Sequence, residues 1–506
     1  MHVNYLLTHD LGTSGDKATL FSEDGSLIGS KVSSYPVHYF NKNWAEQDPQ
    51  DWWRAFCENT AALIRQSDID PKRIAAVSFS GQMMGCLCVD RGGVPLRPAI
   101  IWADSRAQAQ ADELERSISQ QEFYHITGHR NTPSYGLQKL MWVRDHEPEV
   151  YAKTHQVLNA KDYLVFRLTG VFCTDHSDAN GMACFDINTR AWSERIIRCA
   201  GIDPRKLPPA FPSVHVAGGI TPQAAALTGL SPGTPVVIGA GDGVAANVGA
   251  GSIAPGRTYC CMGTSAWITT TTQSPIFDPD MRTVTWCHAI PGLYAPNGTM
   301  QAAGASYSWL RDTVCTDELR QAGQEGISPY ALIDAQAAQS PLGANGLVFL
   351  PYLMGERAPR WNPDASGAFL GITAAATRGD LIRSVLEGVA MNLSIVLDIL
   401  RAHVDIDEIV VIGGGAKGPL WRQIMADIYQ TRVVVPTLLE EAGAMGAAVI
   451  GGVGAGLFQN FTAIDRFLSF SSACVPNPDT AAGYACLRLR FERCYQALES
   501  TYPLFR

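Results

Sequence analysis

The sequence predicts an α/β protein of two large domains with a ligand cleft between them. The chain has 506 residues, which is more than one average domain of roughly 150 residues requires. A strand–turn–strand segment containing Gly-Thr-Ser occurs twice, at residues 10–15 and 262–265, about half a chain apart. Between the two copies, a short β-branched run ends in a glycine turn that holds a single carboxylate. These three observations together indicate two similar halves that share one site.

The first copy is a predicted β-hairpin, with strands at residues 3–8 and 17–21 around the loop of residues 12–15. The backbone N–H groups and hydroxyls of Thr13 and Ser14 can hold a phosphate, and Asp10 can act as an oxygen ligand for a hydrated Mg²⁺. Gly-Thr-Ser-Gly is also ordinary turn chemistry, so one hairpin leaves both interpretations open.

The second copy, at residues 259–268, repeats the order of strand, Gly-Thr-Ser and strand, and places Gly263 and Thr264 in the turn. A phosphate-loop hairpin at the start of each half predicts an internal duplication that clamps one polyphosphate between the two domains.

Residues 44–53 lead into a helix that we expect to run to about Gln66, with Trp52 and Trp53 in the core. A strand at residues 74–80 follows and ends in a loop at residues 81–85. After the next apolar run, Asp104 and Arg106 beside Trp102 can bind sugar hydroxyls through charge-assisted hydrogen bonds. Alternatively, Asp104 caps the following helix and pairs with Arg106.

The central stretch, residues 236–249, predicts a buried strand, a glycine turn and a helix. Asp242 then lies beyond the carboxyl end of the strand, where open α/β sheets bind their ligands, and this makes it a candidate general base. Aspartate is equally a favoured helix N-cap, so this stretch alone leaves both roles open.

In the second half, a long amphipathic helix is expected at residues 380–400, and a strand at residues 409–412 runs into the turn of residues 413–418. This turn lets a nucleotide approach the backbone closely. We place the domain division near residue 250, giving domains 1–248 and 249–506, with cleft closure as the expected motion. A final helix from about Asp479 is expected to pack back across the first domain.

Composition narrows the range of partners. Lys and Arg number 39 against 48 Asp and Glu, a net charge of −9, and no basic run indicates binding to nucleic acid or to a membrane surface. Thirteen irregularly spaced cysteines favour reduced thiols over disulfides or a zinc site. No 18-residue apolar run and no signal-like N-terminus is present, so a cytoplasmic protein is expected. Nothing in the sequence decides between a monomer and a homodimer.

Motifs along nearly the whole chain resemble those of FGGY-family carbohydrate kinases, and the sequence is most similar to xylulokinases. The matching segments are DLGTS at 10–14, WAEQDPQDWW at 44–53, SGQMMG at 80–85, WADSR at 102–106, KLMW at 139–142, GAGDG at 239–243, MGTS at 262–265, GERAPRWNPDASGAFLGIT at 355–373, DLIRSVLEGVAMNL at 380–393, GGGAKGPLWRQIMAD at 413–427 and AGAMGAA at 442–448. The resemblance implies two ribonuclease-H-like domains of the actin/Hsp70/hexokinase superfamily, with ATP and sugar in the cleft between them.

Carried over position by position, the resemblance also implies roles for single residues. Asp10 would be the metal- and phosphate-side aspartate, and Asp242 the catalytic base. The phosphate loops and the nucleotide turn would be formed by Thr13, Ser14, Gly263, Thr264, Gly414, Gly415 and Ala416, and the sugar side by Gln82, Met83, Met84, Trp102, Asp104 and Asp242. The cofactors implied are ATP and Mg²⁺, and the reaction is phosphorylation of a terminal sugar hydroxyl.

Two departures from the family pattern bear on the substrate. Xylulokinases usually carry Gln-Met-His where this chain has Gln82-Met83-Met84, and Asp-Asn where it has Asp242-Gly243. Losing two polar partners disfavours a substrate with hydroxyls at those places, because an unmatched buried hydroxyl costs about 1–3 kcal/mol. The first expectation is D-xylulose converted to xylulose 5-phosphate; the alternatives are L-xylulose, ribulose, an erythritol-like polyol or glycerol.

Some features of the sequence also occur in two other classes of protein. Gly413-x-Gly415-x-x-Gly418 after a strand matches a dinucleotide fingerprint, as in NAD-dependent oxidoreductases, but the acidic residue expected after the next strand is replaced by Pro436 and Thr437. A non-catalytic sugar or ATP sensor is the second alternative, and the presence of Asp242 argues against it. A P-loop NTPase is excluded because no GxxxxGK[ST] occurs.

Overall fold

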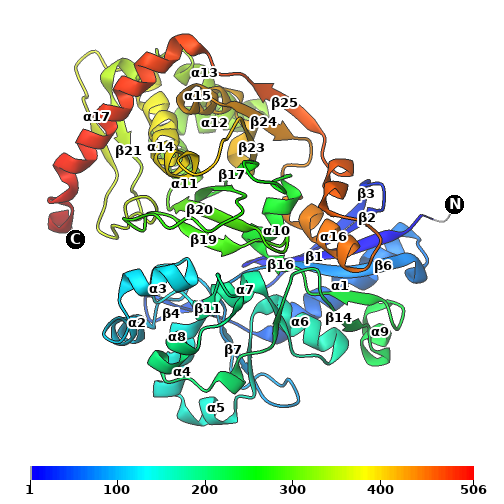
Figure 1. Cartoon of the computed structure of the whole chain (residues 1–506). Helices are drawn as coiled ribbons and strands as arrows, with labels where there is room; N and C mark the ends of the chain where they lie inside the picture. The colour runs from blue at the N-terminus through cyan, green and yellow to red at the C-terminus, as the bar shows by residue number, and fades with distance from the viewer. Residues whose placement is uncertain (1–2, 506) are drawn as a thin grey trace.

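Two mixed β-sheets form the framework of the computed structural model, which describes residues 3–505 (Figure 1). Within these residues, the first sheet has the order β14-β15-β6-β1-β2-β3, with β16 also paired to β6, and the second has the order β19-β20-β18-β17-β23-β24-β25. The strands are β1 (Tyr5–Leu11), β2 (Gly15–Ser22), β3 (Leu27–Ser34), β6 (Ile74–Gly81), β14 (Val216–Gly219), β15 (Pro235–Val237), β16 (Ala240–Gly241), β17 (Thr258–Met262), β18 (Ala266–Thr270), β19 (Val284–Cys287), β20 (Tyr294–Met300), β23 (Glu408–Ile412), β24 (Arg432–Pro436) and β25 (Phe470–Cys474).

The two sheets repeat one topology. In the first, β1 pairs antiparallel with β2 and parallel with β6, and β15 follows parallel to β6. In the second, β17 pairs antiparallel with β18 and parallel with β23, and β24 follows parallel to β23. The repeated Gly-Thr-Ser hairpin is therefore a repeat of structure, and the expected duplicated α/β fold is confirmed.

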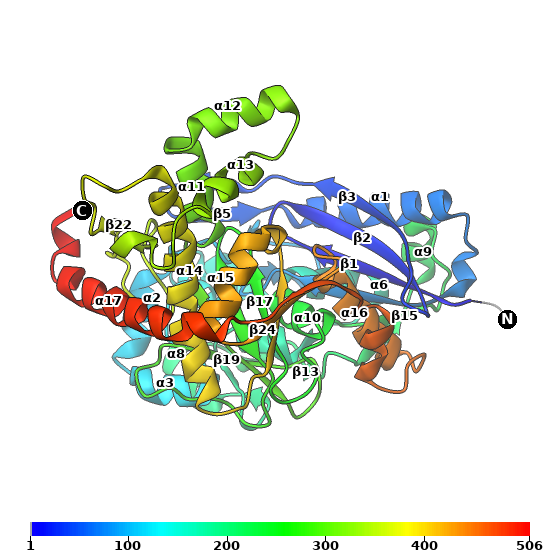
Figure 2. The same ribbon diagram turned by 90° about the horizontal axis from the view of Figure 1, so that it is seen from above.

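Helices cover both sheets, and Figure 2 shows them from above. They are α1 (Pro49–Ser67), α2 (Gln108–Glu115), α3 (Gln120–Thr127), α4 (Gly136–His146), α5 (Pro148–Lys153), α6 (Ala160–Thr169), α7 (His176–Gly181), α8 (Glu194–Ala200), α9 (Pro222–Thr228), α10 (Asp242–Gly249), α11 (Gly304–Thr313), α12 (Thr316–Glu325), α13 (Pro329–Ala337), α14 (Arg378–Arg401), α15 (Pro419–Tyr429), α16 (Ala442–Gly454) and α17 (Ala481–Glu499).

Helix α1 forms as the sequence predicts. The Asp48 side chain accepts a hydrogen bond from the Gln50 N–H at 2.9 Å and so caps the helix. Trp52 and Trp53 are buried against the first sheet, which confirms their expected place in the core.

Helices α10 and α16 pack against each other where the two halves meet (Figure 1). A Cβ atom at Gly446 would lie 1.8 Å from the carbonyl oxygen of Ala245, and one at Gly249 would lie 1.7 Å from that of Ala442. Only residues without a side chain fit at this distance, because real Cβ atoms do not approach a backbone so closely. The small-residue helix expected near residues 442–448 packs on this helix and also on the first sheet, where a Cβ atom at Gly451 would lie 2.8 Å from that of Ser78, so the expected close helix–sheet packing is confirmed.

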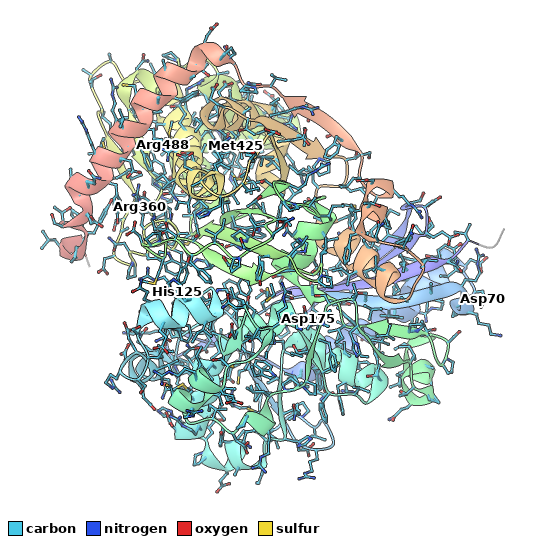
Figure 3. All side chains as sticks on the ribbon, viewed as in Figure 1. Asp70, His125, Asp175, Arg360, Met425 and Arg488 are labelled. Carbon is cyan, nitrogen blue, oxygen red and sulfur yellow. The ribbon has the colours of Figure 1, made fainter. Side chains whose placement is uncertain are left out.

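The final helix differs from the expectation. Helix α17 packs on the second half, where Tyr484 and Phe491 join a core cluster with Leu350 of β21 (Val348–Leu350). Arg360, labelled beside α17 in Figure 3, pairs with Glu492 at 2.6 Å. The apolar face of α17 has its complement in this half, so the prediction that it crosses the first domain is wrong.

Two further features concern the whole chain. All thirteen cysteines are free thiols. Among residues 3–505, none of the helices has the length and apolar character needed to span a bilayer.

The helix contact can be tested by adding one methyl group. Gly446→Ala should lower the melting temperature, since overpacking of a tight contact costs about 1–3 kcal/mol or more. Gly323→Ala in α12 is the matched control, because a Cβ there meets nothing within 4 Å and alanine favours a helix. Thermal unfolding of both variants is the measurement, and equal melting temperatures would contradict the steric argument.

Candidate active site

A cavity of about 640 Å³ lies in the second half, at the carboxyl ends of β17 and β23. Gly263 and Thr264 of the second hairpin loop and Gly414 and Gly415 of the glycine turn all line it. Ala416 is fully buried next to the turn and does not line the cavity. Four of the five residues expected on the nucleotide side of this half are thus brought together.

The far wall of this cavity is aromatic. The Tyr307 ring lies 4.8 Å from Tyr330 and 5.5 Å from Trp421, measured between ring centroids. The Tyr307 hydroxyl donates to Asp334, and burial raises the pKa values of both groups. Flat apolar walls opposite backbone N–H groups suit a ligand with an aromatic ring and an anionic tail, and the volume is that of a cofactor site.

A second cavity, of about 470 Å³, lies between the two halves. Met84, Trp102 and Tyr135 from the first half face Trp286, Glu356 and Arg357 from the second. Polar side chains, among them Asn297 and Gln301, complete the lining. Their buried amide oxygens have no hydrogen-bond partner among residues 3–505. Rings beside free polar atoms can bind a small polyhydroxylated molecule.

The loop that bears Met84 is held by a buried amine. Lys139 of α4 donates to the carbonyl oxygens of Met84 and Ile101 at 2.8 Å and to that of Ser134 at 2.5 Å. Burial lowers the pKa of Lys139 to about 7. Met84 itself has a left-handed backbone, with φ of 62°, which fixes the direction of its side chain.

Two charged groups of the second half lie side by side in this cavity. Glu356 accepts hydrogen bonds from the N–H groups of Gln301 and Arg357, at 2.6 and 2.8 Å, and from the Asn392 amide. Burial raises the pKa of Glu356 to about 8, against the opposing effect of these hydrogen bonds and of the Arg357 charge. The Arg357 guanidinium forms no ion pair within residues 3–505, and its Nε is buried without a partner. It is therefore a partly desolvated cation facing the cavity.

Asp242 is the first residue of α10, and Gly241 is the N-cap. Within residues 3–505 its carboxylate accepts only the N–H of the adjacent Gly243, at 2.7 Å. The alternative that Asp242 serves as the helix cap is therefore wrong. The side chain is reached by solvent, yet the dense protein around it raises its pKa to about 7, mainly by desolvation and then by the charge of Asp10. A solvent-facing carboxylate with this pKa can exchange protons near neutral pH.

Asp10 lies on β1, one strand away from the end of β16. The Ser80 hydroxyl donates to it at 2.6 Å, and a Cβ atom at Gly443 of α16 would lie 3.3 Å from its other oxygen. Desolvation raises the pKa of Asp10, and the hydrogen bond from Ser80 opposes that rise. Asp10 and Asp242 are thus close enough to interact and lie where both halves meet.

The other expected residues are distributed less simply. Thr13 accepts a hydrogen bond from the Trp102 indole at 2.8 Å, which joins the first hairpin loop to the second cavity. Ser14 lies in the same loop, and its carbonyl oxygen accepts the Tyr35 N–H. Gln82 donates to Gln47 and is buried.

Two of the expected sugar-side residues point elsewhere. The Met83 side chain is buried against Gly241, where a Cβ atom would come within 2.4 Å of its sulfur. Asp104 is fully buried: Arg106 pairs with it at 2.7 Å and the Ala45 N–H donates to it at 2.6 Å. Asp104 does not line the cavity. It pairs with Arg106 without capping α2, whose N-cap is Ala107.

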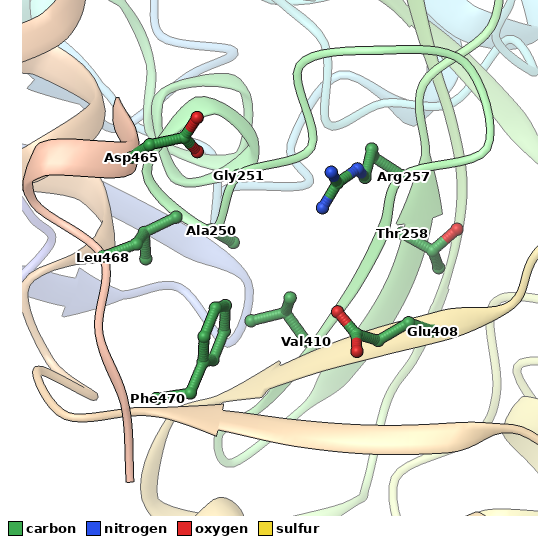
Figure 4. Close-up of a pocket in the computed structure, with 9 residues that line it drawn as sticks. All are labelled: Ala250, Gly251, Arg257, Thr258, Glu408, Val410, Asp465, Leu468 and Phe470. Carbon is green, nitrogen blue, oxygen red and sulfur yellow. The ribbon is translucent and has the colours of Figure 1, made fainter. Parts of the chain in front are cut away.

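Sequence reasoning missed the aromatic wall of Tyr307, Tyr330 and Trp421, because these residues come from three separate elements and share no motif. Arg357 could have been found from the sequence. It follows Glu356 in a loop after an apolar strand, and charged residues are rarely buried without a functional or pairing reason. A smaller hollow of about 190 Å³ near the end of α10 contains none of the expected residues; Arg257, Glu408 and Asp465 line it (Figure 4).

Comparison with known proteins agrees with this geometry. A model of the N-terminal domain of the FGGY family of carbohydrate kinases matches residues 5–249, and a model of the C-terminal domain matches residues 258–455. The chain is 33% identical to a gluconokinase of Bacillus subtilis over 502 residues, covering 99% of this chain and 97% of the relative. It is 32% identical to a xylulose kinase of the same organism over 496 residues, covering 97% of each chain.

Solved structures give the same picture. A gluconate kinase from Lactobacillus acidophilus superposes with a TM-score of 0.92 at 27% identity and covers 100% of both chains. A ligand-bound xylulose kinase from that organism also gives 0.92, at 28% identity, covering 99% of this chain and 100% of the other.

The raised pKa of Asp242 predicts a pH-dependent effect on stability. The folded state holds the proton up to about pH 7, whereas the unfolded chain loses it near pH 4, so wild-type stability falls as pH rises between these values. Asp242→Asn should therefore raise the melting temperature by an amount that grows from about pH 4 to pH 7 and is constant above. Asp68→Asn, at an exposed left-handed residue, controls for loss of a charge as such. A stabilisation that does not change with pH would contradict the assignment.

Proposed function

The chain belongs to the FGGY family of carbohydrate kinases, and on that premise we propose that it transfers the γ-phosphoryl group of ATP to a terminal hydroxyl of a small open-chain sugar or polyol. The observation that carries the proposal is the Asp242 carboxylate, which faces solvent, does not cap a helix and has a pKa of about 7. Phosphoryl transfer to an alcohol needs a general base of this kind, together with tight positioning of both substrates.

In the proposed reaction, ATP occupies the 640 Å³ cavity with its base against Tyr307 and Trp421. Its phosphates run past the Gly263 and Thr264 turn toward Asp10. The sugar occupies the 470 Å³ cavity beside Met84 and Trp102. Asp242 accepts the hydroxyl proton as that oxygen attacks the γ-phosphorus in line, and backbone N–H groups of the two hairpin loops offset the charge on the transferring group.

Mg²⁺ fits the residues that are present. Among residues 3–505, no cluster of three or more potential ligands could hold a metal ion alone, and Mg²⁺ typically binds one or two carboxylates together with substrate phosphates. Asp10 would hold it. When bound, the ion neutralises charge on the β- and γ-phosphate oxygens.

D-xylulose is the first substrate candidate, supported by the xylulose kinases among the relatives. The missing polar side chains at Met84 and Gly243 weaken its binding relative to a site with His and Asn there. D-gluconate is the second candidate, supported by the gluconokinase relatives. The specific observation in its favour is Arg357, because an unpaired guanidinium in the sugar cavity matches a carboxylate in charge and shape.

Other parts of the proposal follow from the same site. We place the domain division at residue 249 and expect the halves to close on both substrates. Thirteen unpaired thiols suit the reducing cytoplasm. The mass of the protein in solution would distinguish a monomer from a homodimer. Family membership removes the dinucleotide-dependent oxidoreductase from consideration; a non-catalytic sensor would bind ATP without sugar-dependent turnover.

The general base gives the decisive test. Purified protein with Mg²⁺ and ATP should show sugar-dependent ADP release, with a kcat that rises with pH through about 7 as Asp242 loses its proton. Asp242→Asn should lower kcat about 100- to 10,000-fold and leave ATP binding, measured by calorimetry, nearly unchanged. A variant that keeps its kcat would overturn the role of Asp242, and ATP binding without turnover on any sugar would favour the sensor.

Arg357 separates the two sugars. If the substrate is D-gluconate, Arg357→Gln should reduce kcat/KM for gluconate by about 10- to 100-fold, the value of one charge-assisted pair, and should have little effect with a neutral ketose. If wild-type protein prefers D-xylulose and Arg357→Gln affects both sugars equally, the gluconate alternative is wrong. Steady-state kinetics with each sugar at saturating ATP is the measurement.

A further inference from the structure

Behind the candidate site lies a fully buried cluster of charges that the proposed mechanism does not use. Lys161 of α6 contacts three carboxylates, those of Asp162 at 2.8 Å, Asp175 at 2.9 Å and Asp178 at 3.1 Å. All four side chains have zero exposure. Figure 3 labels Asp175, whose carboxylate caps the N-terminus of α7. Buried ion clusters add little net stability, because the cost of desolvating the charges offsets their attraction.

One connection leads from the cluster to the strand before Asp242. The Ser177 hydroxyl donates to Asp175 at 2.6 Å and accepts the N–H of Gly241 at 2.9 Å. Gly241 also touches the Met83 side chain, and it pairs with Gly81 across β16 and β6. The backbone that leads into Asp242 is thus fixed on three sides, and one of them depends on the buried cluster.

A second connection leads to the loop of the sugar cavity. Asp162 accepts the N–H of Asn159 at 3.2 Å, and the Asn159 side chain accepts the N–H of Gly85 at 2.9 Å. The stem of Lys161 packs against Gly81, where a Cβ atom would lie 3.1 Å from that of Lys161. At the other end of α7, Gly181 lies against Met84. The cluster therefore reaches both ends of the 81–85 loop.

We infer that Lys161, with Asp175 and Ser177, forms a positioning unit that sets the place of Asp242 relative to the sugar loop. The inference rests on the proposed function, in which Asp242 is the base and residues 82–85 contact the sugar. One ammonium group binds carboxylates that lead to both parts of the site, so neither part can shift without disturbing the other. A rigid link of this kind serves catalysis because a displacement of about 1 Å can cost about 100-fold in rate.

The charge states are consistent with this arrangement. Desolvation opposes charge on Lys161, but the three carboxylates outweigh it and raise its pKa well above the usual value. Asp175 has a lowered pKa, because Lys161 and the two serine hydroxyls outweigh desolvation. Asp178 has a strongly raised pKa, chiefly from desolvation. The lowered pKa of Asp175 keeps it ionised at neutral pH, so its carboxylate can accept the hydrogen bond from Ser177.

The test uses the hydroxyls, because removing Lys161 would leave three buried carboxylates without a cation and unfold the chain. Ser177→Ala removes the link to Gly241. Ser213→Ala is the matched control, since the Ser213 hydroxyl donates to the same Asp175 oxygen at 2.7 Å and is equally buried, but its side chain does not contact Gly241. Ser177→Thr restores a hydroxyl, and Ser177→Cys, with a weaker acceptor, replaces the alanine variant if that one fails to fold.

With the sugar that wild-type protein turns over, Ser177→Ala should lower kcat about 10- to 100-fold, shift the pH midpoint of kcat and leave KM for ATP little changed. Ser213→Ala should lower the melting temperature comparably and leave kcat and its pH midpoint in place, and Ser177→Thr should recover most of the rate. Asn159→Ala should instead raise KM for the sugar.

Two negative results are distinguishable. Absence of wild-type turnover overturns the kinase proposal itself, and this inference with it. With wild-type turnover present, equal kcat values for Ser177→Ala and Ser213→Ala overturn the positioning role alone.

Discussion

The close packing of α10 against α16 is the contact on which the rest of the site depends. Helix α10 begins at Asp242, and α16 begins beside Asp10, near Gly443. The two helices touch through Gly249 and Gly446, where a single methyl group would overlap backbone. One helix pair thus joins the duplicated halves, whereas the two carboxylates, more than two hundred residues apart in the sequence, are brought together by the pairing of β1 and β16 with β6 in the first sheet. The duplication supplies two similar sheets, and the helix contact makes a single site from them.

Much of this architecture could be predicted because its signals are local. The two Gly-Thr-Ser hairpins, the Asp48 cap of α1 and the strand leading to Asp242 each lie within a dozen residues. Partner choice in the interior is not local. The sequence offers Arg106, two residues away, as a partner for Asp104, but the Ala45 amide, 59 residues away, also donates to this carboxylate. Burial forces a carboxylate to find donors, and the sequence does not say which distant donors are near. The packing of α17 likewise depends on a complementary apolar surface around β21, whose residues are far from α17 in the sequence.

The site holds three carboxyl groups whose pKa values are raised, Asp10, Asp242 and Glu356. The surroundings of each carboxyl group favour its protonated form more than water does. Such groups lower stability, and a protein keeps them only where the frame around them is rigid. Here the frame is supplied by two buried lysines, Lys139 under the sugar loop and Lys161 behind Asp242. Both lie in the first half, whereas the nucleotide cavity is built from glycine turns and aromatic rings of the second.

The backbone at Met84 limits which side chains this position of the cavity can hold. A left-handed conformation at φ of 62° is tolerated best by glycine, asparagine, aspartate and histidine, and worst by β-branched residues. Methionine is not among the residues that favour this conformation. Exchange with histidine, the residue xylulokinases usually place here, requires no change of backbone. A change at position 84 alone would leave the second departure, Gly243, in place, and valine, isoleucine or threonine at position 84 would strain the backbone.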